Sequence, residues 1–306
     1  MTPTRPTPTF ASRISPILSD VLQFSGNFGA AASHGPEKGS QADQEWYHNT
    51  ETGPGGAWGR KPVEFAYAVA GTAMIPAAGQ YLAALSQLLN DEMALFGFQA
   101  VVRSLVESAA RSWWILDPNI GVRERVERAY EERWYSLQEL RKANNSVKPQ
   151  PLKSHESLML KISADAAQLG LAERTSNEQE LVNVKKIVGY GKRRPDSTDL
   201  IPEFLEPLGL PNGELWYRSV SGLTHSVLYA TMNFWEPGIV ESSGMLKLEP
   251  QLPLITVANA AVLGVVAYLG SIERHALIYG RKWKDIEMKR NATAALIFTI
   301  ANDFMN

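Results

Sequence analysis

The chain has 306 residues and a formal net charge of −2, from 30 Lys and Arg against 32 Asp and Glu. This length is enough for one or two domains with a sizeable core. Hydrophobic residues make up 44% and charged residues 20%, which excludes a chain that is disordered throughout. The balanced charge argues against a protein that coats nucleic acid through bulk charge. The lack of cysteine excludes disulfides, thiolate catalysis and cysteine-ligated zinc or iron–sulfur sites.

Residues 1–60 differ in composition from the rest of the chain. Proline and glycine recur through this segment, for example at Pro16 and Gly26. Because both residue types interrupt regular structure, we expect an irregular and partly disordered N-terminal extension over residues 1–60. Trp46 and Trp58 predict that part of it docks on the body of the protein. No charged segment followed by an apolar one opens the chain, so we expect no secretory signal and a cytoplasmic location.

From about residue 61 onward, apolar residues recur every three to four positions, which is the helical period. The predicted helices span residues 77–90, 98–116, 118–144, 153–170, 176–189, 214–232, 253–279 and 283–304. Residues 233–251 are rich in proline and glycine and predict a loop or a short hairpin. We therefore expect an all-α fold, with a single multi-helix, bundle-like domain over residues 61–306.

The most apolar stretch of the chain covers residues 252–272, which carry no formal charge and are long enough to span a bilayer. Its hydrophobicity is mild, because Pro253, Thr256 and Asn259 interrupt it. A helix that is apolar on every side is usually buried in a protein core. We therefore predict a central core helix and no membrane partner.

One predicted helix in the C-terminal third carries a polar constellation. A helical wheel of residues 214–232 places four apolar residues on the core-facing side: Trp216, Val220, Leu223 and Val227. Arg218 and His225 are seven residues apart and share the opposite side, with Ser221 beside them. The wheel therefore predicts that a guanidinium and an imidazole face away from the core together.

These residue types suit the cleavage of a phosphodiester without a metal. A histidine gives or takes a proton near neutral pH, and an arginine forks onto phosphate oxygens. His225 would act on a ribose 2′-OH or on the leaving oxygen, and Arg218 would stabilise charge at phosphorus. Ser221 would orient the imidazole or bind a phosphate oxygen. A structural role is the alternative, because every amphipathic helix has a polar stripe opposite its apolar one.

The spacing from Arg218 to His225 resembles the R-x(4–6)-H motif of the HEPN superfamily. The segment from Tyr217 through Ser221 to His225 is also similar to the Y-x-x-x-S-x-x-x-H pattern of bacterial proteins of the DUF5677 type. In those proteins an earlier helix often carries Arg-x-x-x-Glu, and Arg103 and Glu107 stand in these positions here.

This resemblance implies a metal-independent ribonuclease of bacterial defence or of a toxin–antitoxin system, without a cofactor. The implied catalytic residues are Arg218, His225, Ser221 and Tyr217, with Arg103 and Glu107 in support. The implied partners are RNA, an antitoxin or another protein, and a second copy of the chain in a homodimer. A non-catalytic interaction module of the same fold is the alternative.

Two further charged groups stand out. Arg103, Glu107 and Arg111 are four residues apart and predict either an inter-helix polar site or a row of surface ion pairs. Five basic residues surround the segment Gly189-Tyr190-Gly191: Lys185, Lys186, Lys192, Arg193 and Arg194. Backbone N–H groups at the glycines and a stacking Tyr190 would suit nucleic acid, and a solvated basic loop is the alternative.

No metal site is predicted, because the five histidines are far apart and no H-E-x-x-H motif is present. His275 lies near the end of the predicted helix 253–279, where we expect it to act as a cation on the helix dipole. The tryptophans suggest a third function, a small-molecule pocket between helices. The candidate lining residues are Trp114, Trp134, Trp216 and Trp235.

Overall fold

The computed structural model of the chain describes residues 9–32, 35–90, 97–147, 153–176, 186–224, 235–237, 248–250 and 254–305. The α-helices are α1 (Phe10–Ala32), α2 (Gln41–His48), α3 (Lys61–Ala68), α4 (Ile75–Asn90), α5 (Gly97–Ile115), α6 (Val122–Val147), α7 (Lys153–Leu169), α8 (Ser197–Leu205), α9 (Gly213–Thr224), α11 (Leu254–Ile278) and α12 (Trp283–Met305). A π-helical segment, η1 (Val69–Met74), joins α3 to α4, and a 3₁₀ turn, η2 (Glu206–Leu208), follows α8. The predicted all-α fold is confirmed.

The described strands form short antiparallel pairs at the edges of the helical body. They are β1 (Thr52–Gly53) with β2 (Gly56–Ala57), β3 (Glu173–Ser176) with β4 (Lys186–Tyr190), and β5 (Trp235–Pro237) with β6 (Leu248–Pro250). The β5–β6 pair falls within residues 233–251, where a loop or a short hairpin was predicted. The predicted helix over 176–189 is wrong at both ends, because Ser176 belongs to β3 and residues 186–190 pair with it as β4. Residues 177–185 lie outside the described residues.

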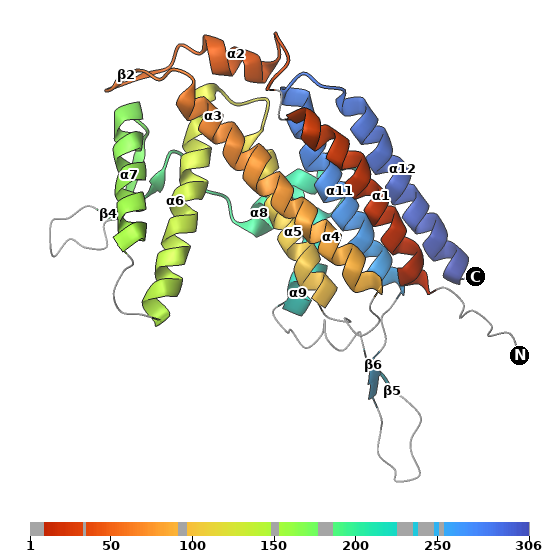
Figure 1. Cartoon of the computed structure of the whole chain (residues 1–306). Helices are drawn as coiled ribbons and strands as arrows, with labels where there is room; N and C mark the ends of the chain where they lie inside the picture. Colours follow the sequence, from red (N-terminus) through yellow and green to blue (C-terminus); the bar gives the residue numbers. More distant parts are fainter. Residues whose placement is uncertain are drawn as a thin grey trace, which may run out of the picture.

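Helix α11 is the centre of the fold. Nearly every residue from Val257 to Ile272 is buried, on all sides of the helix. Helices α1, α4, α5 and α12 pack around it (Figure 1). Two stretches, Lys61–Leu89 and Leu254–Ile278, are long and apolar enough to cross a membrane by length and composition. In the fold, most of the apolar window of the second stretch is buried inside the bundle.

Helix α1 corrects the expectation of an irregular extension over residues 1–60. Its apolar residues Phe10, Ile14, Leu18 and Val21 follow the helical spacing, and all four are buried. Pro16 lies inside the helix on its exposed side. Helix α1 packs on α4 and α11, so this segment belongs to the same core as the remainder of the chain.

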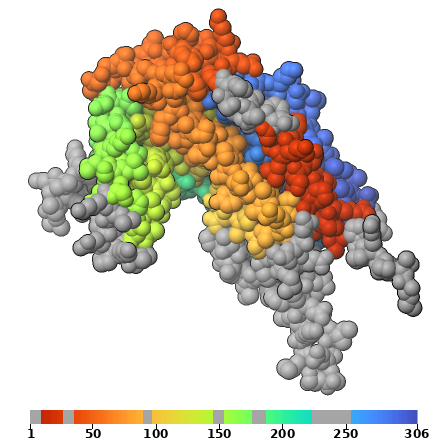
Figure 2. Space-filling view, in the orientation of Figure 1, coloured from red at the N-terminus to blue at the C-terminus, as the bar shows by residue number. Residues whose placement is uncertain are grey.

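Helices α6 and α7 stand to one side of the bundle, and α2 with the β1–β2 hairpin lies across one end (Figure 1). Figure 2 shows that the surface is hollowed between α6 and α7 on one side and α4 and α5 on the other. Helix α3 packs on α6, whereas α5 and α6 make few contacts. The α6–α7 pair is therefore joined to the bundle chiefly at one end.

Arg125 fixes that junction. Its side chain is fully buried and forms an ion pair with Glu45, with Nε 2.8 Å from Oε2. The guanidinium also donates to the carbonyl oxygens of Ile115 at 2.6 Å and Asp117 at 3.0 Å. The Tyr67 hydroxyl donates to the same Glu45 carboxylate at 2.9 Å. One arginine of α6 thereby links α2, α3 and the end of α5.

We expect Arg125→Ala to lower the free energy of unfolding by about 3 kcal/mol, because it removes a fully buried cation and leaves the largely buried Glu45 carboxylate without it. Urea denaturation measures this loss. Lys142→Ala on the same helix removes an exposed cation and should leave the free energy of unfolding nearly unchanged. Equal effects of the two substitutions would contradict the role given to Arg125.

Candidate functional site

The face that helix α9 presents to the core is rotated from the one that the helical wheel predicts, although Val220 is buried as expected. Gly213, Tyr217 and Val220 are buried, whereas Trp216 is only half-buried. A Cβ atom on Gly213 would lie 2.7 Å from the Cα atom of Pro202, so this glycine allows α9 to start directly against α8. The buried face of α9 is therefore rotated toward Tyr217, which the resemblance had placed in the catalytic group.

Tyr217 meets the Arg-x-x-x-Glu motif of α5. Its hydroxyl donates a hydrogen bond to Glu107 Oε1 at 2.7 Å. Arg103 forms an ion pair with the same carboxylate, with its Nε 2.9 Å away. The Arg103 guanidinium carbon also lies 5.9 Å from the centre of the Tyr217 ring. Three residues singled out in the sequence on two separate helices thus form one inter-helix polar site.

Burial and the contact with Glu107 keep the Tyr217 hydroxyl protonated. Burial of Tyr217, and then its hydrogen bond to the Glu107 carboxylate, raise the pKa of the phenol above its ordinary value. Tyr217 is therefore a neutral hydrogen-bond donor at physiological pH. A donor held in this way orients the Glu107 carboxylate toward α9.

Arg218 lies on the solvent side of α9. Its side chain is 64% exposed and forms an ion pair with Glu214, one turn earlier, at 2.7 Å. Ser221 is half-buried. His225 follows the last described residue of α9, Thr224, and lies outside the described residues. The predicted alignment of Arg218 with His225 therefore stays a prediction.

Arg111 extends the polar site of α5 toward the loop before α8. The side chain is buried and pairs with Glu132 of α6 at 3.5 Å. It also donates to the carbonyl oxygen of Pro195 at 2.6 Å and to the hydroxyl of Ser197 at 3.4 Å. Burial lowers the pKa of Arg111, and the Glu132 carboxylate offsets part of that effect. The Arg103–Glu107–Arg111 spacing thus belongs to an inter-helix polar site and not to a surface row.

The predicted basic surface near Tyr190 is largely paired with carboxylates. Lys192 lies 3.0 Å from Glu124, and Arg194 lies 2.7 Å from Glu132. Arg193 is 79% exposed, and its nearest described carboxylate, Asp196, is 3.8 Å away. Lys185 lies outside the described residues, and only the backbone of Lys186 is described. Of the cations that can be assessed, Arg193 is thus the one most available to a phosphate.

The proposed stacking role of Tyr190 is wrong. Its side chain is fully buried and packs against Trp134 with the ring centres 5.5 Å apart. The neighbouring backbone groups are also occupied: Tyr190 N–H donates to Glu131 at 2.8 Å and Gly191 N–H to the Ala172 carbonyl at 2.7 Å. A Cβ atom on Gly189 would overlap Arg174 and Glu131. These glycines serve close packing of β4 on α6.

The tryptophan pocket predicted from the sequence stays a prediction, because only part of its lining is described. Trp114 and Trp134 are buried in the core, and the side chain of Trp235 is outside the described part of the structure. Among the described residues, two of the cavities that flank the bundle are lined by other side chains and not by Trp114, Trp134 or Trp216. Among the residues that the structure describes, no three His, Asp or Glu side chains gather as metal ligands.

One of these cavities, of about 630 Å³, lies between α1, η1–α4 and α11, and His275 lines it. His275 is buried and stacks on Tyr279 with the ring centres 4.0 Å apart. Burial, with a smaller effect of the Arg281 charge, lowers the pKa of His275 to about 4. His275 is therefore neutral at pH 7, and its predicted role as a cation on the helix dipole is wrong. The sequence signal for burial was its place seven residues after Tyr268 on the apolar helix α11.

His275 should make the fold sensitive to acid. Its pKa is about 4 in the folded state and about 6.5 in an unfolded chain. As the pH falls from 6.5 to 4, the unfolded state takes up the proton first, and about 3 kcal/mol of stability is lost. Urea denaturation at pH 7 and pH 4 should show that His275→Gln lacks this component, whereas His48→Gln, at an exposed position, retains it. The same pH dependence in both variants would contradict the assignment.

Tyr217→Phe should lower the free energy of unfolding by about 1–3 kcal/mol, because it removes a hydrogen bond to a charged group at a buried position. Thermal or urea denaturation measures the change. Tyr47→Phe is the matched control, since that tyrosine is 54% exposed and the same atom is removed. If the two variants lost the same stability, the Tyr217–Glu107 contact would not hold α9 on α5.

Comparisons with known proteins identify no relative of the chain. None of the models of protein families, the curated proteins or the solved structures matches it. The inference of function therefore rests on the motifs of the sequence and on the contacts of the described residues.

Proposed function

We propose that the protein is an HEPN-like, metal-independent endoribonuclease whose active site lies on α9. Arg218 and His225 would carry the chemistry, and Ser221 would assist them. Tyr217 is a positioning residue in this proposal, because its buried hydroxyl is bonded to Glu107. Arg103 and Glu107 would hold α9 in place from α5.

The observation that carries the proposal is the hydrogen bond between Tyr217 and Glu107. These residues belong to the two motifs of the family resemblance, which are separated by 110 residues along the chain. If the two short motifs matched the family by chance, their residues would not be expected to contact each other. Their contact, together with the Arg103–Glu107 ion pair, supports a shared role for the two helices.

The chemistry follows from the position of Arg218. Exposed ion pairs contribute little to stability, so an RNA phosphate can displace Glu214 from Arg218 at small cost. The His225 imidazole would take the proton of a ribose 2′-OH, and the 2′-oxygen would attack phosphorus. The bond to the 5′-oxygen breaks, and the imidazolium returns the proton to that oxygen. Arg218 would stabilise the charge that builds on the phosphoryl oxygens, and the product would be a 2′,3′-cyclic phosphate.

The loop before α8 gives RNA a second contact in this proposal. Arg193 is well exposed, and the loop is tied to the α9 site because Arg111 bonds both Pro195 and Ser197. The homodimer and the antitoxin or other protein partner implied by the resemblance stay predictions.

A non-catalytic interaction module of the same fold is the second candidate. The burial of Tyr217 favours it, because a residue placed in the catalytic motif by resemblance here has its hydroxyl inside the helix interface. In that case His225→Ala would alter stability or partner binding, and no RNA would be cleaved by the parent protein.

The test is cleavage of single-stranded RNA by the purified protein in EDTA. We expect fragments that end in 2′,3′-cyclic phosphate, and we expect His225→Ala and Arg218→Ala each to slow cleavage by about 100-fold or more. Lys142→Ala is the matched control. Like Arg218, Lys142 is an exposed cation beside a carboxylate of its own helix, but that helix is α6 and not α9. It should cleave at the parental rate.

Two results would overturn the proposal. The first is an absence of cleavage by the folded parent protein, and the second is equal cleavage by the parent and by His225→Ala. Circular dichroism of each variant separates a loss of chemistry from a loss of fold.

A further inference from the structure

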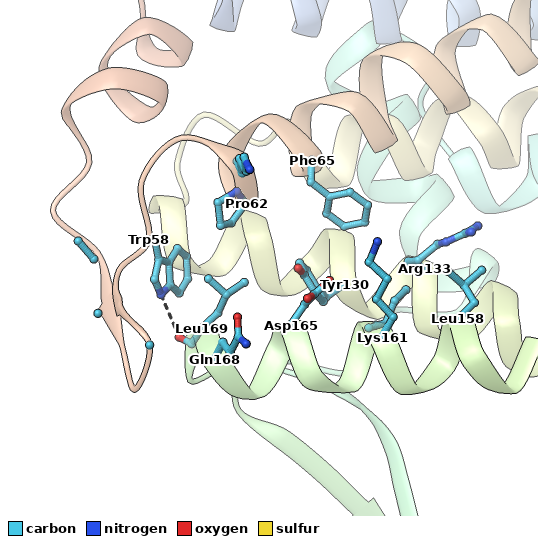
Figure 3. Close-up of a pocket in the computed structure, with 15 residues that line it drawn as sticks. Trp58, Pro62, Phe65, Tyr130, Arg133, Leu158, Lys161, Asp165, Gln168 and Leu169 are labelled. Atoms are coloured by element: carbon cyan, nitrogen blue, oxygen red, sulfur yellow. Dashed lines mark hydrogen bonds between the residues drawn. The ribbon is translucent and has the colours of Figure 1, made fainter.

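A second cavity, of about 530 Å³, lies between the β1–β2 hairpin, α3, α6 and α7 (Figure 3). Its volume is within the range of small-molecule sites in proteins. None of its lining residues belongs to the proposed site on α9. A ligand in this cavity would therefore bind independently of ribonuclease activity.

At one end of this cavity, the β1–β2 hairpin is hydrogen-bonded to the C-terminal turn of α7. The indole N–H of Trp58 donates to the carbonyl oxygen of Leu169 at 2.9 Å, and Gly55 N–H donates to that of Gln168 at 2.9 Å. These bonds satisfy carbonyl groups in the last turn of α7, which have no partner inside their own helix. A Cβ atom on Gly53 would overlap the backbone of Leu169, so the glycine is needed for this close docking. The hairpin therefore holds Trp58 firmly at the cavity.

Aromatic side chains form part of the apolar lining, together with aliphatic residues such as Leu158 and Ile162. Phe65 and Tyr130 meet edge to face, with ring centres 5.1 Å apart. Figure 3 places them between Trp58 at one end and Lys161 with Arg133 at the other. Such a wall suits the packing of a flat, apolar group.

Tyr130 supplies an unused polar atom. Its side chain is only 7% exposed, and its hydroxyl makes no hydrogen bond to any residue that the structure describes. Burial, and then the charge of Asp165, raise the pKa of Tyr130 to about 12, so the phenol is a neutral donor at pH 7. Tyr130 lines the cavity, so its hydroxyl can donate a hydrogen bond to an acceptor on a bound molecule.

The charges around the cavity are unbalanced. Lys61, Arg133 and Lys161 line it, against the single carboxylate of Asp165. Lys161 and Asp165 are four residues apart on α7, the usual spacing of a helical ion pair. Even so, within the described part of the chain none of the three cations lies within ion-pair distance of a carboxylate. An anion bound between Lys161 and Arg133 would give both cations a partner.

We propose that this cavity binds a small phosphorylated aromatic molecule of the nucleoside monophosphate class. The phosphate lies between Lys161 and Arg133, where guanidinium and ammonium groups bind its oxygens. The base packs against the wall of Trp58 and Phe65, and the Tyr130 hydroxyl donates to an acceptor on the ligand.

Isothermal titration calorimetry of the full chain with AMP, adenosine and inorganic phosphate tests the proposal. We expect AMP to bind more tightly than either of the two parts, because it fills the aromatic and the cationic ends together. Lys161→Gln and Arg133→Gln should each weaken AMP binding by about tenfold, the loss of one charge-assisted contact, and leave adenosine binding unchanged. Asp165→Asn should tighten AMP binding, because it removes the only carboxylate of the lining.

Lys142→Gln is the matched control, because it removes an exposed cation of α6 that does not line the cavity. It should bind AMP like the parent protein. No binding of AMP at millimolar concentration would overturn the proposal, and so would equal effects of Lys161→Gln and Lys142→Gln. Inorganic phosphate that binds as tightly as AMP would also overturn it, because the aromatic wall would then have no role.

Discussion

The constraint on which the rest of the fold depends is that α11 is apolar on every side. Such a helix must be enclosed, and enclosing it takes α1, α4, α5 and α12 together. The N-terminal segment is therefore part of the core despite its proline and glycine content. The same enclosure leaves α6 and α7 outside the first layer, so that Arg125 and α3 have to connect them to the bundle.

Periodicity alone predicts most of the helices, because their apolar faces are long and regular. It fails where a local sequence pattern favours one structure and packing against distant residues favours another. Residues 10–32 carry both Pro16 and the apolar series from Phe10 to Val21, and the burial of that series prevails. Ser176 begins a capping-box pattern, yet residues 186–190 pair with β3 because Tyr190 is buried against Trp134 and its N–H bonds Glu131.

The α5–α9 site could be predicted only in part. The four-residue spacing of Arg103 and Glu107 predicts that they meet each other, but spacing within one helix cannot identify a partner on another. The wheel placed Trp216 at the centre of the buried face. In the structure the buried face also includes Tyr217, because the carboxylate of Glu107 gives its hydroxyl a partner inside the interface. A polar contact of this kind rotates α9 in a way that hydrophobicity alone does not predict.

The contrast between the two polar regions of α6 bears on function. Toward the bundle, Arg111, Arg125 and Arg194 each lie beside a carboxylate, as low-dielectric surroundings require. Toward α7, Arg133 and Lys161 have no such partner among the described residues, although Asp165 is one turn from Lys161. Natural sequences depart from local consistency chiefly at functional sites. The cluster of three cations at this cavity, beside an aromatic wall and only one carboxylate, is therefore consistent with a bound anion.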